Sequence, residues 1–497
     1  MDLRPSSTGF GQVMCEHRAD KLAAIVPLGK PHRFMARLIV VSNRVALPDQ
    51  SLPAGGLAVG VLAALHGPDG GVWFGWSGKT QESPSAEPEV HEKDNIRFVT
   101  VDLPSASFDG YYNGFCNGSL WPLHHYFPGT FRYDPQEFSA YMAVNRYFSE
   151  ALVKLVQDGD VIWVHDYQLI PLGSLLRQAG VKARIGFFLH IPYPNIAVLR
   201  LLPTYAELVR DMCQYDLVGL QTSEDLDGFR SAVKAVFPDE AEFHEEQVEL
   251  KGRQIEVGVF PIGVDVDVVA RQAEDAVRDD EQVKQLQRGL LGRKLLLGVD
   301  RLDYSKGLLE RFASYQALLE STPDLQGQIT YIQIAPLSRV DVPAYADLRD
   351  ALERATGRIN GQFADTDWTP IRYLNKDFSH STLSGFLRIA NVGFVTPVRD
   401  GMNLVAKEFV AAQDPEDPGV LVLSSLAGAA QELVGALLVN PYDKAAVALA
   451  LQQALAMPLA ERRSRHESML QALRTNSISR WHESFVSRLA GGERGKD

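Results

Sequence analysis

The sequence predicts a doubly wound α/β protein built from two such units. Short β-branched apolar runs alternate with helical patterns along most of the chain. The runs are apolar without interruption, which is typical of parallel strands buried on both faces. A chain of 497 residues, 45% of them hydrophobic, is also long enough for two cores. Alternating strands and helices of this kind predict parallel sheets with helices on both faces.

The predicted strands can be read in chain order. They are residues 38–42, 161–164, 185–189, 217–220, 295–299, 330–334, 392–395, 420–423 and 436–439. Proline and glycine interrupt an extended run at 260–265, near the middle of the chain, so we expect the chain to cross between the two units there. The Ser/Pro/Glu-rich stretch 81–94 is interpreted as a solvated surface loop.

The first 34 residues differ from the rest in composition. They mix Arg, His, Pro and Ser without a period, and Met35 then leads directly into the first predicted strand. We interpret 1–34 as a disordered extension and Met35 as an alternative start.

Charge and cysteine content exclude several classes of protein. The net charge of −13 opposes binding to nucleic acid or an anionic membrane, so a phosphorylated substrate needs a local basic cluster. Cys15, Cys116 and Cys213 lie far apart without a CxxC pair, which favours a reducing cytoplasm over a disulfide framework. No apolar run approaches the ~20 residues of a spanning helix.

Candidate phosphate and sugar contacts lie early in the chain. Arg44 follows the first strand, and Gly55 and Gly56 precede an apolar helix, where backbone N–H groups can approach a phosphate closely. The segment from Tyr112 to Trp121 concentrates aromatic rings that suit a sugar. A structural turn and a packed aromatic cluster are the respective alternatives. The adjacent His124 and His125 lack a spaced third ligand, so we expect no metal there.

Two later strands in this half end in polar side chains. Asp166 comes after 161–164 and His190 after 185–189. A carboxylate and an imidazole at neighbouring strand ends can orient sugar hydroxyls. A capping Asp and a histidine satisfied within the core are the alternatives.

The second half offers cations and carboxylates at its strand ends. Arg301 and Lys306 share a short loop that can clamp a diphosphate, although both could instead be solvated and paired with Asp300 and Asp303. Arg339 lies beyond 330–334.

The last candidate loop precedes a helix. Asp400 comes shortly before a helix that begins near Leu404, whose N-terminus favours an anion, while Asp400 and Glu408 can accept hydrogen bonds from hydroxyls. A simple N-cap role for Asp400 is the alternative.

Taken in order, these motifs resemble those of the trehalose-6-phosphate synthases, which are retaining glycosyltransferases of family 20. The resemblance runs from about Arg37 to about Val486. The shared segments are SNRVALP, AGGLAVG, WFGWSG, YYNGF with LWP, IWVHDYQL, GFFLHIPYP, VDRLDYSKGL, IAPLSR, GRING, PVRDGMNLVAKEFVAAQ and LVNPYD. In the loop after His190 the chain reads Tyr193-Pro194-Asn195-Ile196, where members often carry a Phe-Pro-Thr/Ser type, and this difference can change the fit of the donor.

The resemblance implies a GT-B fold, with two facing Rossmann-like domains and the active site in the cleft between them. It implies catalytic roles for Asp166, His190, Arg301, Lys306 and Asp400. It implies that the acceptor, glucose 6-phosphate, is bound by Arg44, Tyr112, Trp121, Asp166 and Arg339. It implies that the donor, UDP-glucose, is bound by Gly55, Gly56, Arg301, Lys306, Phe378, Asp400, Leu404, Val405, Ala406, Lys407 and Glu408. No cofactor and no metal is expected.

The resemblance also implies a domain plan and partners. The acceptor domain is expected at 35–260, the donor domain at 261–475, and a C-terminal helix that packs back on the first domain, with the tail, at 476–497. A homodimer or homotetramer in the cytoplasm is expected, with no nucleic acid or membrane partner and with dephosphorylation by a separate phosphatase. The sequence leaves open ADP- or GDP-glucose as donor, a related synthase acting on glycerol 3-phosphate, a pseudo-glycosyltransferase, and a non-catalytic sugar-phosphate sensor.

Overall fold

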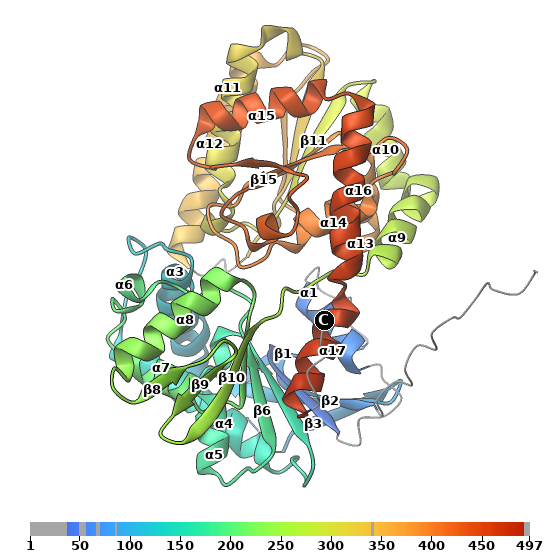
Figure 1. Cartoon of the computed structure of the whole chain (residues 1–497). Helices are drawn as coiled ribbons and strands as arrows, with labels where there is room; N and C mark the ends of the chain where they lie inside the picture. Colours follow the sequence, from blue (N-terminus) through green and yellow to red (C-terminus); the bar gives the residue numbers. More distant parts are fainter. Residues whose placement is uncertain (1–36, 49–55, 66–69, 85–86, 339–341, 492–497) are drawn as a thin grey trace, which may run out of the picture. The chain divides into compact units, whose positions relative to one another are not determined.

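The computed structural model describes residues 37–48, 56–65, 70–84, 87–338 and 342–491. The expectations for 1–34, Gly55 and Arg339 lie outside these ranges. The described residues form two sheets, each covered by helices on both faces (Figure 1). The predicted doubly wound α/β class is confirmed.

The first sheet has ten strands in the order β3-β4-β2-β1-β5-β6-β7-β10-β9-β8. Its strands are β1 (Leu38–Arg44), β2 (Gly71–Gln81), β3 (Glu89–Lys93), β4 (Ile96–Pro104), β5 (Val161–His165), β6 (Arg184–Phe188), β7 (Leu217–Leu220), β8 (Ala241–Phe243), β9 (Gln247–Leu250) and β10 (Arg253–Val259). Neighbours from β4 to β10 are parallel, while β3, β9 and β8 extend the ends antiparallel. The loop predicted at 81–94 is therefore wrong in part, because 89–93 pairs with β4 as an edge strand.

The second sheet has six parallel strands in the order β13-β12-β11-β14-β15-β16. They are β11 (Lys294–Val299), β12 (Ile329–Ile334), β13 (Ile371–Leu374), β14 (Val392–Val395), β15 (Val420–Ser424) and β16 (Leu437–Val439). This order, third-second-first-fourth-fifth-sixth, is that of a dinucleotide-binding Rossmann fold. Each of the nine runs predicted as strands overlaps a strand of one of the two sheets.

The helices connect these strands. They are α1 (Gly56–Leu65), α2 (Ser105–Phe108), the π-helix η1 (Asp109–Leu120), α3 (Trp121–His124), α4 (Pro135–Val153), α5 (Leu172–Gln178), α6 (Ile196–Leu199), α7 (Tyr205–Met212), α8 (Ser223–Val236), α9 (Val266–Asp279), α10 (Glu281–Leu290), α11 (Leu308–Ser321), α12 (Pro343–Phe363), α13 (His380–Ile389), α14 (Leu404–Ala412), α15 (Lys444–Ala456), α16 (Leu459–Thr475) and α17 (Ile478–Leu489). Single-turn 3₁₀ helices lie at Tyr167–Leu169, Tyr304–Lys306, Pro323–Leu325 and Gly428–Gln431.

Strand β1 shows why continuous apolar runs form the centre of the sheet. Val40 packs into one core with α1 and α17, and Ile39 and Val41 pack into another with η1, α4 and α5. Successive side chains of a strand point to opposite faces, so both faces need apolar residues when both are covered. Val40 pairs in parallel register with Trp73 of β2 and Trp163 of β5.

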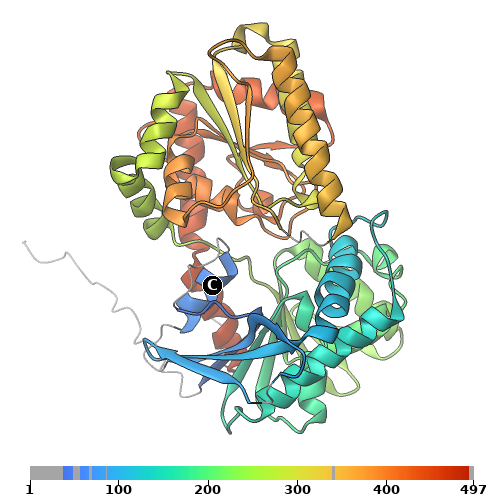
Figure 2. The same cartoon turned by 180° about the vertical axis from the view of Figure 1, so that it is seen from behind.

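The chain passes between the two sheets twice. Residues 260–265 connect β10 to α9, and Asn476 and Ser477 connect α16 to α17. Helix α17, red in Figures 1 and 2, then lies beside α1 and against the first sheet. Its Trp481 and Phe485 rings pack 5.0 and 4.8 Å from the ring of Trp163.

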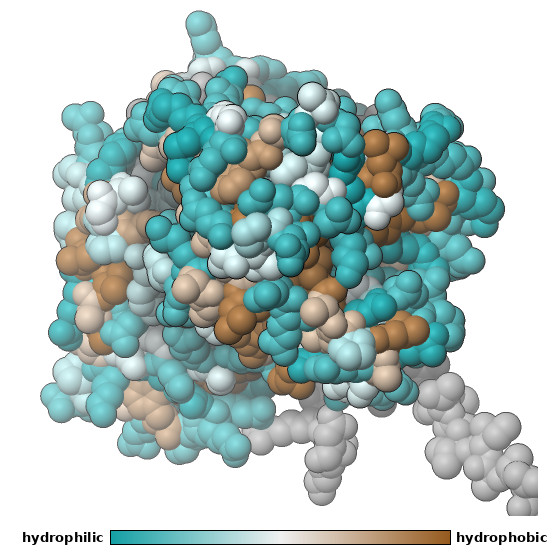
Figure 3. Space-filling view, turned by 90° about the horizontal axis from the view of Figure 1, so that it is seen from above, coloured by the Kyte–Doolittle hydropathy of each residue, from teal (hydrophilic) through white to brown (hydrophobic). Residues whose placement is uncertain are grey.

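The surface in Figure 3 is mostly hydrophilic, with small, dispersed groups of hydrophobic residues. Among the described residues, no helix combines the length and apolarity needed to cross a bilayer.

Candidate active site

Among the parallel strands of each sheet, the strand order reverses at one place, and the candidate residues follow the strands on either side of that place. In the first sheet the reversal lies between β1, which ends in Arg44, and β5, which Asp166 follows. In the second it lies between β11, followed by Arg301, and β14, followed by Asp400. Ligands of open α/β sheets bind beyond the carboxyl ends of strands at such reversals. Each sheet thus has one candidate ligand-binding position, at the carboxyl ends of the strands on either side of the reversal.

Arg44 lies in an aromatic setting at the end of β1. Its guanidinium lies 5.9 Å from the centroid of the Trp76 ring, and Tyr112 of η1 lies 6.4 Å from that same ring. A Cβ at Gly78 would approach the guanidinium to 2.9 Å, so only glycine leaves the arginine this position. Arg44 is exposed, whereas Trp76 is buried, and a charged group on a rigid apolar base is suited to hold a phosphate.

Trp121, at the start of α3, contacts Arg301 in the loop that follows β11 of the second sheet. The guanidinium of Arg301 lies 6.0 Å from the centroid of its ring, and the ring of His125 stacks on it at 4.0 Å. Trp121 is buried and Arg301 is exposed. An arginine over the face of an indole is held by a cation–π attraction. The predicted acceptor tryptophan and the predicted donor arginine are therefore neighbours.

Asp166 and His190 meet at the ends of β5 and β6. The backbone N–H of His190 donates to Oδ1 of Asp166 over 3.2 Å. Asp166 has a φ of 77°, which is uncommon for any residue other than glycine and often marks a functional site. The expected alternative of a helix-capping Asp166 is wrong, because its side chain makes no cap to the following 3₁₀ turn.

Lys306 and Asp400 form an ion pair across the reversal in the second sheet. Nζ of Lys306 lies 2.5 Å from Oδ2 of Asp400, and Asn403 donates to that same oxygen over 3.0 Å. Burial, the largest single effect, raises the pKa of Asp400, but Lys306, His125 and Asn403 together outweigh it and hold the pKa below its ordinary value. The carboxylate is therefore ionised and oriented before any ligand binds.

The sequence left open that Arg301 and Lys306 pair with Asp300 and Asp303. This alternative is wrong for Lys306, which pairs with Asp400, and for Asp300, which pairs with Arg311. Oδ2 of the buried Asp300 accepts from Arg311 over 2.6 Å. Asp303 accepts from the Ser305 backbone over 2.9 Å and from the Tyr345 hydroxyl over 3.0 Å. The N-cap alternative for Asp400 is also wrong, because Asn403 caps α14 by accepting from Ala406 N–H over 3.0 Å.

Two glycines let the loops pack this closely. Gly307 has a φ of 65°, and a Cβ there would lie 2.6 Å from the Thr396 carbonyl oxygen, just beyond β14. A Cβ at Gly401 would lie 2.4 Å from the carbonyl oxygen of His190. Contacts below 3.0 Å do not occur for real Cβ atoms. Gly401 thus brings the Asp400 loop of the second sheet against the His190 loop of the first.

Helix α14 begins next to this ion pair. Leu404 is its first residue, so the first backbone N–H groups of the helix, which have no partner within the helix, and the positive end of the helix dipole lie near Lys306 and Asp400. The side chain of Lys407 is committed elsewhere: Nζ lies 2.6 Å from Glu432 and donates to the Ile262 carbonyl over 2.8 Å. The segment can therefore offer a donor its backbone at 404 and 405, whereas the Ala406 N–H is bonded to Asn403 and the Lys407 side chain is fully buried.

Phe378 and Glu408 lie on the same side of the second sheet. Phe378 is half-buried against Phe386, with Lys376 Nζ 4.8 Å from its ring centroid. Oε1 of Glu408 lies 3.3 Å from Nε2 of His380, and this hydrogen bond raises the pKa of His380. Both side chains remain partly accessible, as contacts to a nucleoside require.

The structure adds residues that sequence reasoning missed. Asn403 was not named as a candidate, and its contact with Asp400 accompanies a backbone φ of 78°. Arg399 pairs with Glu224 over 3.0 Å and lies over the Tyr126 ring. His165, the last residue of β5, contacts the ring of His190.

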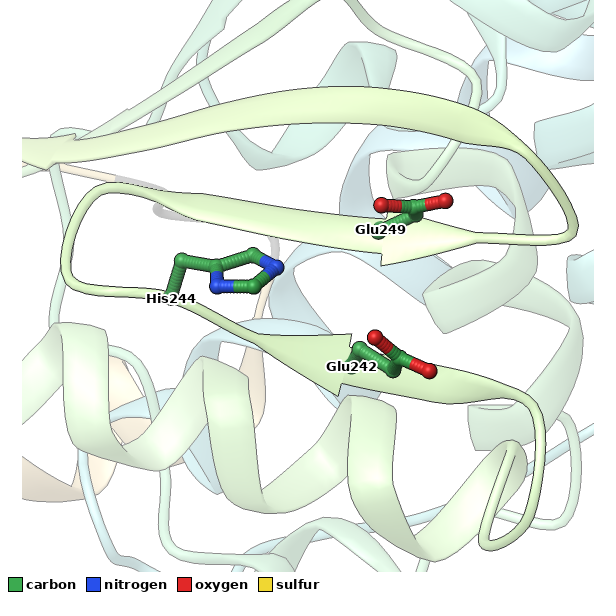
Figure 4. Close-up of side chains that lie close together, drawn as sticks. All are labelled: Glu242, His244 and Glu249. Carbon is green, nitrogen blue, oxygen red and sulfur yellow. The ribbon is translucent and has the colours of Figure 1, made fainter.

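The adjacent His124 and His125, at which no metal is expected, contact backbone carbonyl oxygens through their ring nitrogens. Nδ1 of His124 lies 2.7 Å from the Pro192 carbonyl oxygen, and Nδ1 of His125 lies 2.8 Å from that of Trp121. The described residues hold one group of potential ligands, Glu242, His244 and Glu249, on the β8–β9 hairpin (Figure 4). It belongs to the far edge of the first sheet, and its Glu242 and His244 are exposed.

The family model, the related sequences and the related structures agree on one protein family. The pattern of Glycosyltransferase family 20 matches residues 44–491. A trehalose-6-phosphate synthase of Klebsiella pneumoniae is 47% identical over 92% of this chain and 95% of its own. A Burkholderia xenovorans UDP-forming synthase, solved with glucose-6-phosphate, is 48% identical over 91% of this chain and 100% of its own, with a TM-score of 0.88.

Another solved relative contains an analogue of a nucleotide sugar. An Escherichia coli protein solved with UDP-2-fluoro glucose is 46% identical over 92% of this chain and 99% of its own, with a TM-score of 0.87. Family pattern, sequence identity and fold agree over nearly the whole described chain. The chain belongs to glycosyltransferase family 20.

Proposed function

We propose that this chain transfers glucose from UDP-glucose to glucose 6-phosphate, with retention of configuration, and so forms α,α-trehalose 6-phosphate and UDP. The observation that carries the proposal is the contact between the two candidate ligand-binding positions: Arg301 over Trp121, and Gly401 against His190. These contacts bring residues that we propose to bind the acceptor next to residues that we propose to bind the donor. The relatives solved with glucose-6-phosphate and with UDP-2-fluoro glucose supply the chemistry of the two ligands.

The acceptor binds through its phosphate and its hydroxyls. Arg44, Tyr112 and Trp121, with Arg339, hold the phosphate, and Asp166 accepts hydrogen bonds from hydroxyl groups. Guanidinium groups bind phosphate through two parallel hydrogen bonds, which fixes direction as well as charge. In a chain of net charge −13, such a cluster is the means of attracting a phosphorylated sugar.

The donor binds through its diphosphate, its ribose and its glucose. Arg301, Lys306, the backbone of 404 and 405 and the glycines 55 and 56 hold the diphosphate. Phe378 and Glu408 contact the nucleoside, and Asp400 and His190 hold the glucose. Because Lys306 is already paired with Asp400, its ammonium is positioned before the phosphate arrives. Preorganised charge of this kind stabilises a transition state without reorganisation at the moment of reaction.

The reaction proceeds by substitution on the front face of the donor glucose. The C1 hydroxyl of glucose 6-phosphate attacks C1 of the donor on the side from which UDP leaves. The bond from C1 to the β-phosphate oxygen breaks, and the hydroxyl proton passes to that oxygen. Negative charge grows on the departing phosphate, where Arg301, Lys306 and the N-terminus of α14 stabilise it. Exclusion of water protects the donor from hydrolysis.

Further parts of the proposal concern organisation. The acceptor domain spans 35–260, the donor domain 261–475, and the helix beyond 476 returns to the acceptor domain. The protein acts in the cytoplasm as a homodimer or homotetramer. A separate phosphatase removes the phosphate of the product.

A panel of substrates tests the proposal. Purified protein is assayed in EDTA with UDP-, ADP- and GDP-glucose, each offered glucose 6-phosphate or glycerol 3-phosphate. We expect release of UDP that depends on glucose 6-phosphate, and no requirement for added metal. Transfer to glycerol 3-phosphate alone would favour a related synthase, and binding without turnover would favour a sugar-phosphate sensor. A strict need for Mg²⁺ would contradict the assigned roles of Arg301 and Lys306.

A further inference from the structure

Two histidines share one hydrogen bond at the carboxyl ends of β5 and β6, two neighbouring strands of the first sheet. His165 is the last residue of β5, and His190 follows β6, the next strand in the sheet. Nδ1 of His165 lies 3.0 Å from Nε2 of His190, and the ring planes are inclined by 27°. Two neutral imidazoles at this distance need one hydrogen between the two nitrogens. One ring must donate and the other must accept.

The two rings have different surroundings. His165 is completely buried, and the rings of Trp163, Phe188 and Trp481 lie 4.4 to 6.3 Å from it. Its other nitrogen, Nε2, is buried and has no hydrogen-bond partner among the residues that the structure describes. His190 is less buried; its backbone N–H donates to Asp166, and its carbonyl oxygen lies against Gly401. Burial also lowers the pKa of both rings, that of His190 to about 3, which keeps both neutral.

These surroundings distinguish the two possible tautomers. If His190 donated from Nε2, His165 would carry its hydrogen on Nε2, leaving a buried N–H without an acceptor. If His165 donates from Nδ1, its Nε2 is a bare acceptor. Orphaned buried N–H groups are rarer in proteins than acceptors with unused lone pairs. The second arrangement is therefore favoured.

We propose that His165 is a positioning residue for glucosyl transfer: its Nδ1–H holds His190 in the tautomer that carries hydrogen on Nδ1. His190 then presents the donor glucose with an N–H donor and cannot accept a hydrogen bond or a proton there. This role in turnover rests on the proposed function, whereas the tautomer itself does not. Partners that fix the tautomer of a functional histidine are a recurrent device in proteins.

Nuclear magnetic resonance of the unliganded protein tests the tautomer directly. The full chain is labelled with ¹⁵N-histidine, and the resonances of His165 and His190 are assigned with the variants His165→Asn and His190→Asn. The two-bond couplings from the ring protons identify which nitrogen of each ring is protonated. We expect Nε2 to be unprotonated in both rings. An unprotonated Nδ1 in His190 would overturn the proposal, whatever reaction the protein catalyses.

Two variants of similar size test the role in turnover. In His165→Asn the amide can take the place of Nδ1 and keep the hydrogen bond to His190, whereas His165→Leu removes it. We expect His165→Leu to lower kcat/KM for the sugar donor about tenfold, the loss of one hydrogen bond, and His165→Asn to retain most of the activity. Thermal unfolding of both variants shows whether they fold.

A double-variant comparison separates positioning from a merely structural role. If His165 acts through His190, the change His165→Leu lowers kcat/KM no further in a chain that already carries His190→Ala. Equal losses in the Asn and Leu variants, or independent losses in the double variant, would show that His165 only fills space. If no variant and no wild-type protein turned over, the proposed function would fail while the resonance experiment still decided the tautomer.

Discussion

Lys306 and Asp400 lie 2.5 Å apart, Nζ to Oδ2, and both side chains are mostly buried. The pair joins the loop after β11 to the loop after β14, the two strands between which the order of the second sheet reverses. The cation that we propose binds the diphosphate and the carboxylate that we propose binds the glucose thus hold each other in place. Each is presented to the donor in a fixed position, and Asn403 fixes the carboxylate further.

Replacement of Lys306 tests its assigned role. In Lys306→Met the growing charge on the departing phosphate loses one stabilising partner. We expect kcat to fall by about two to three decades, equivalent to about 3–4 kcal/mol of barrier. Steady-state rates with both substrates provide the measurement. Lys444→Met, an exposed lysine at the start of α15, is the matched control and should leave kcat unchanged. A kcat within threefold of wild type for Lys306→Met would contradict the assignment.

Lys407 is expected to affect stability more than donor contact. Its buried ammonium joins α14 to Ile262 and Glu432, and Glu432 in turn accepts from Asn476 over 2.9 Å, so both passages between the sheets are tied to one ion pair. Lys407→Met leaves Glu432 without its partner and should lower the free energy of unfolding by about 3–5 kcal/mol. Adding Glu432→Gln should restore part of the loss. Urea denaturation measures both variants, and a stable but inactive Lys407→Met would instead assign Lys407 to the donor.

Buried neutral histidines predict a loss of stability in mild acid. Burial lowers the pKa of His124 to about 4 and that of His125 to about 3, against an ordinary 6.5. Below pH 6.5 the unfolded chain takes up protons that the folded chain does not. The free energy of unfolding should therefore fall from about pH 6.5 toward pH 4, by up to about 1.4 kcal/mol per pH unit for each ring.

Urea denaturation at intervals of half a pH unit measures this slope. The variant His124→Gln removes one of the buried neutral rings and should make the slope shallower by up to about 1.4 kcal/mol per pH unit. A slope that is identical in His124→Gln and wild type would mean that His124 is not held neutral.

The two passages between the sheets are expected to act as a hinge. A Cβ at Gly263 would lie 2.1 Å from the Asn476 carbonyl oxygen, so the passages are packed directly on each other. We predict that UDP and glucose 6-phosphate together reduce the radius of gyration in small-angle scattering, because closure excludes water from the reacting sugars. Gly263→Ala should weaken both the compaction and kcat/KM. Gly357→Ala, where a Cβ meets nothing within 4 Å, is the control. Unchanged scattering on ligand addition would contradict closure.

The sequence predicted the framework of the fold well because buried parallel strands leave a strong local signal. The run 392–395 is β14 without change, since four apolar residues between a helix and a loop fit little else. The edge strand Glu89–Lys93 was missed because its residues are mostly polar and exposed, and its pairing partner determines its structure.

The site was less accessible to such reasoning than the strands. Residues at strand ends could be predicted because the ends of neighbouring parallel strands meet at one edge. The side chains with which these residues interact could not be predicted from the sequence. Lys407 pairs with a residue 25 positions away, and Asn403 replaces Asp400 as the cap because it adopts a left-handed backbone conformation. His165 directly follows the predicted strand 161–164, and its contact with His190 depends on the order of β5 and β6 in the sheet.

The product of the reaction tests the central claim most directly. Wild-type protein is incubated with UDP-glucose and glucose 6-phosphate, and the sugar phosphate formed is purified and examined by nuclear magnetic resonance. We predict a non-reducing disaccharide phosphate in which both anomeric centres have the α configuration, with UDP released in equal amount. A β linkage, a reducing product, or release of free glucose from UDP-glucose without transfer would contradict the account.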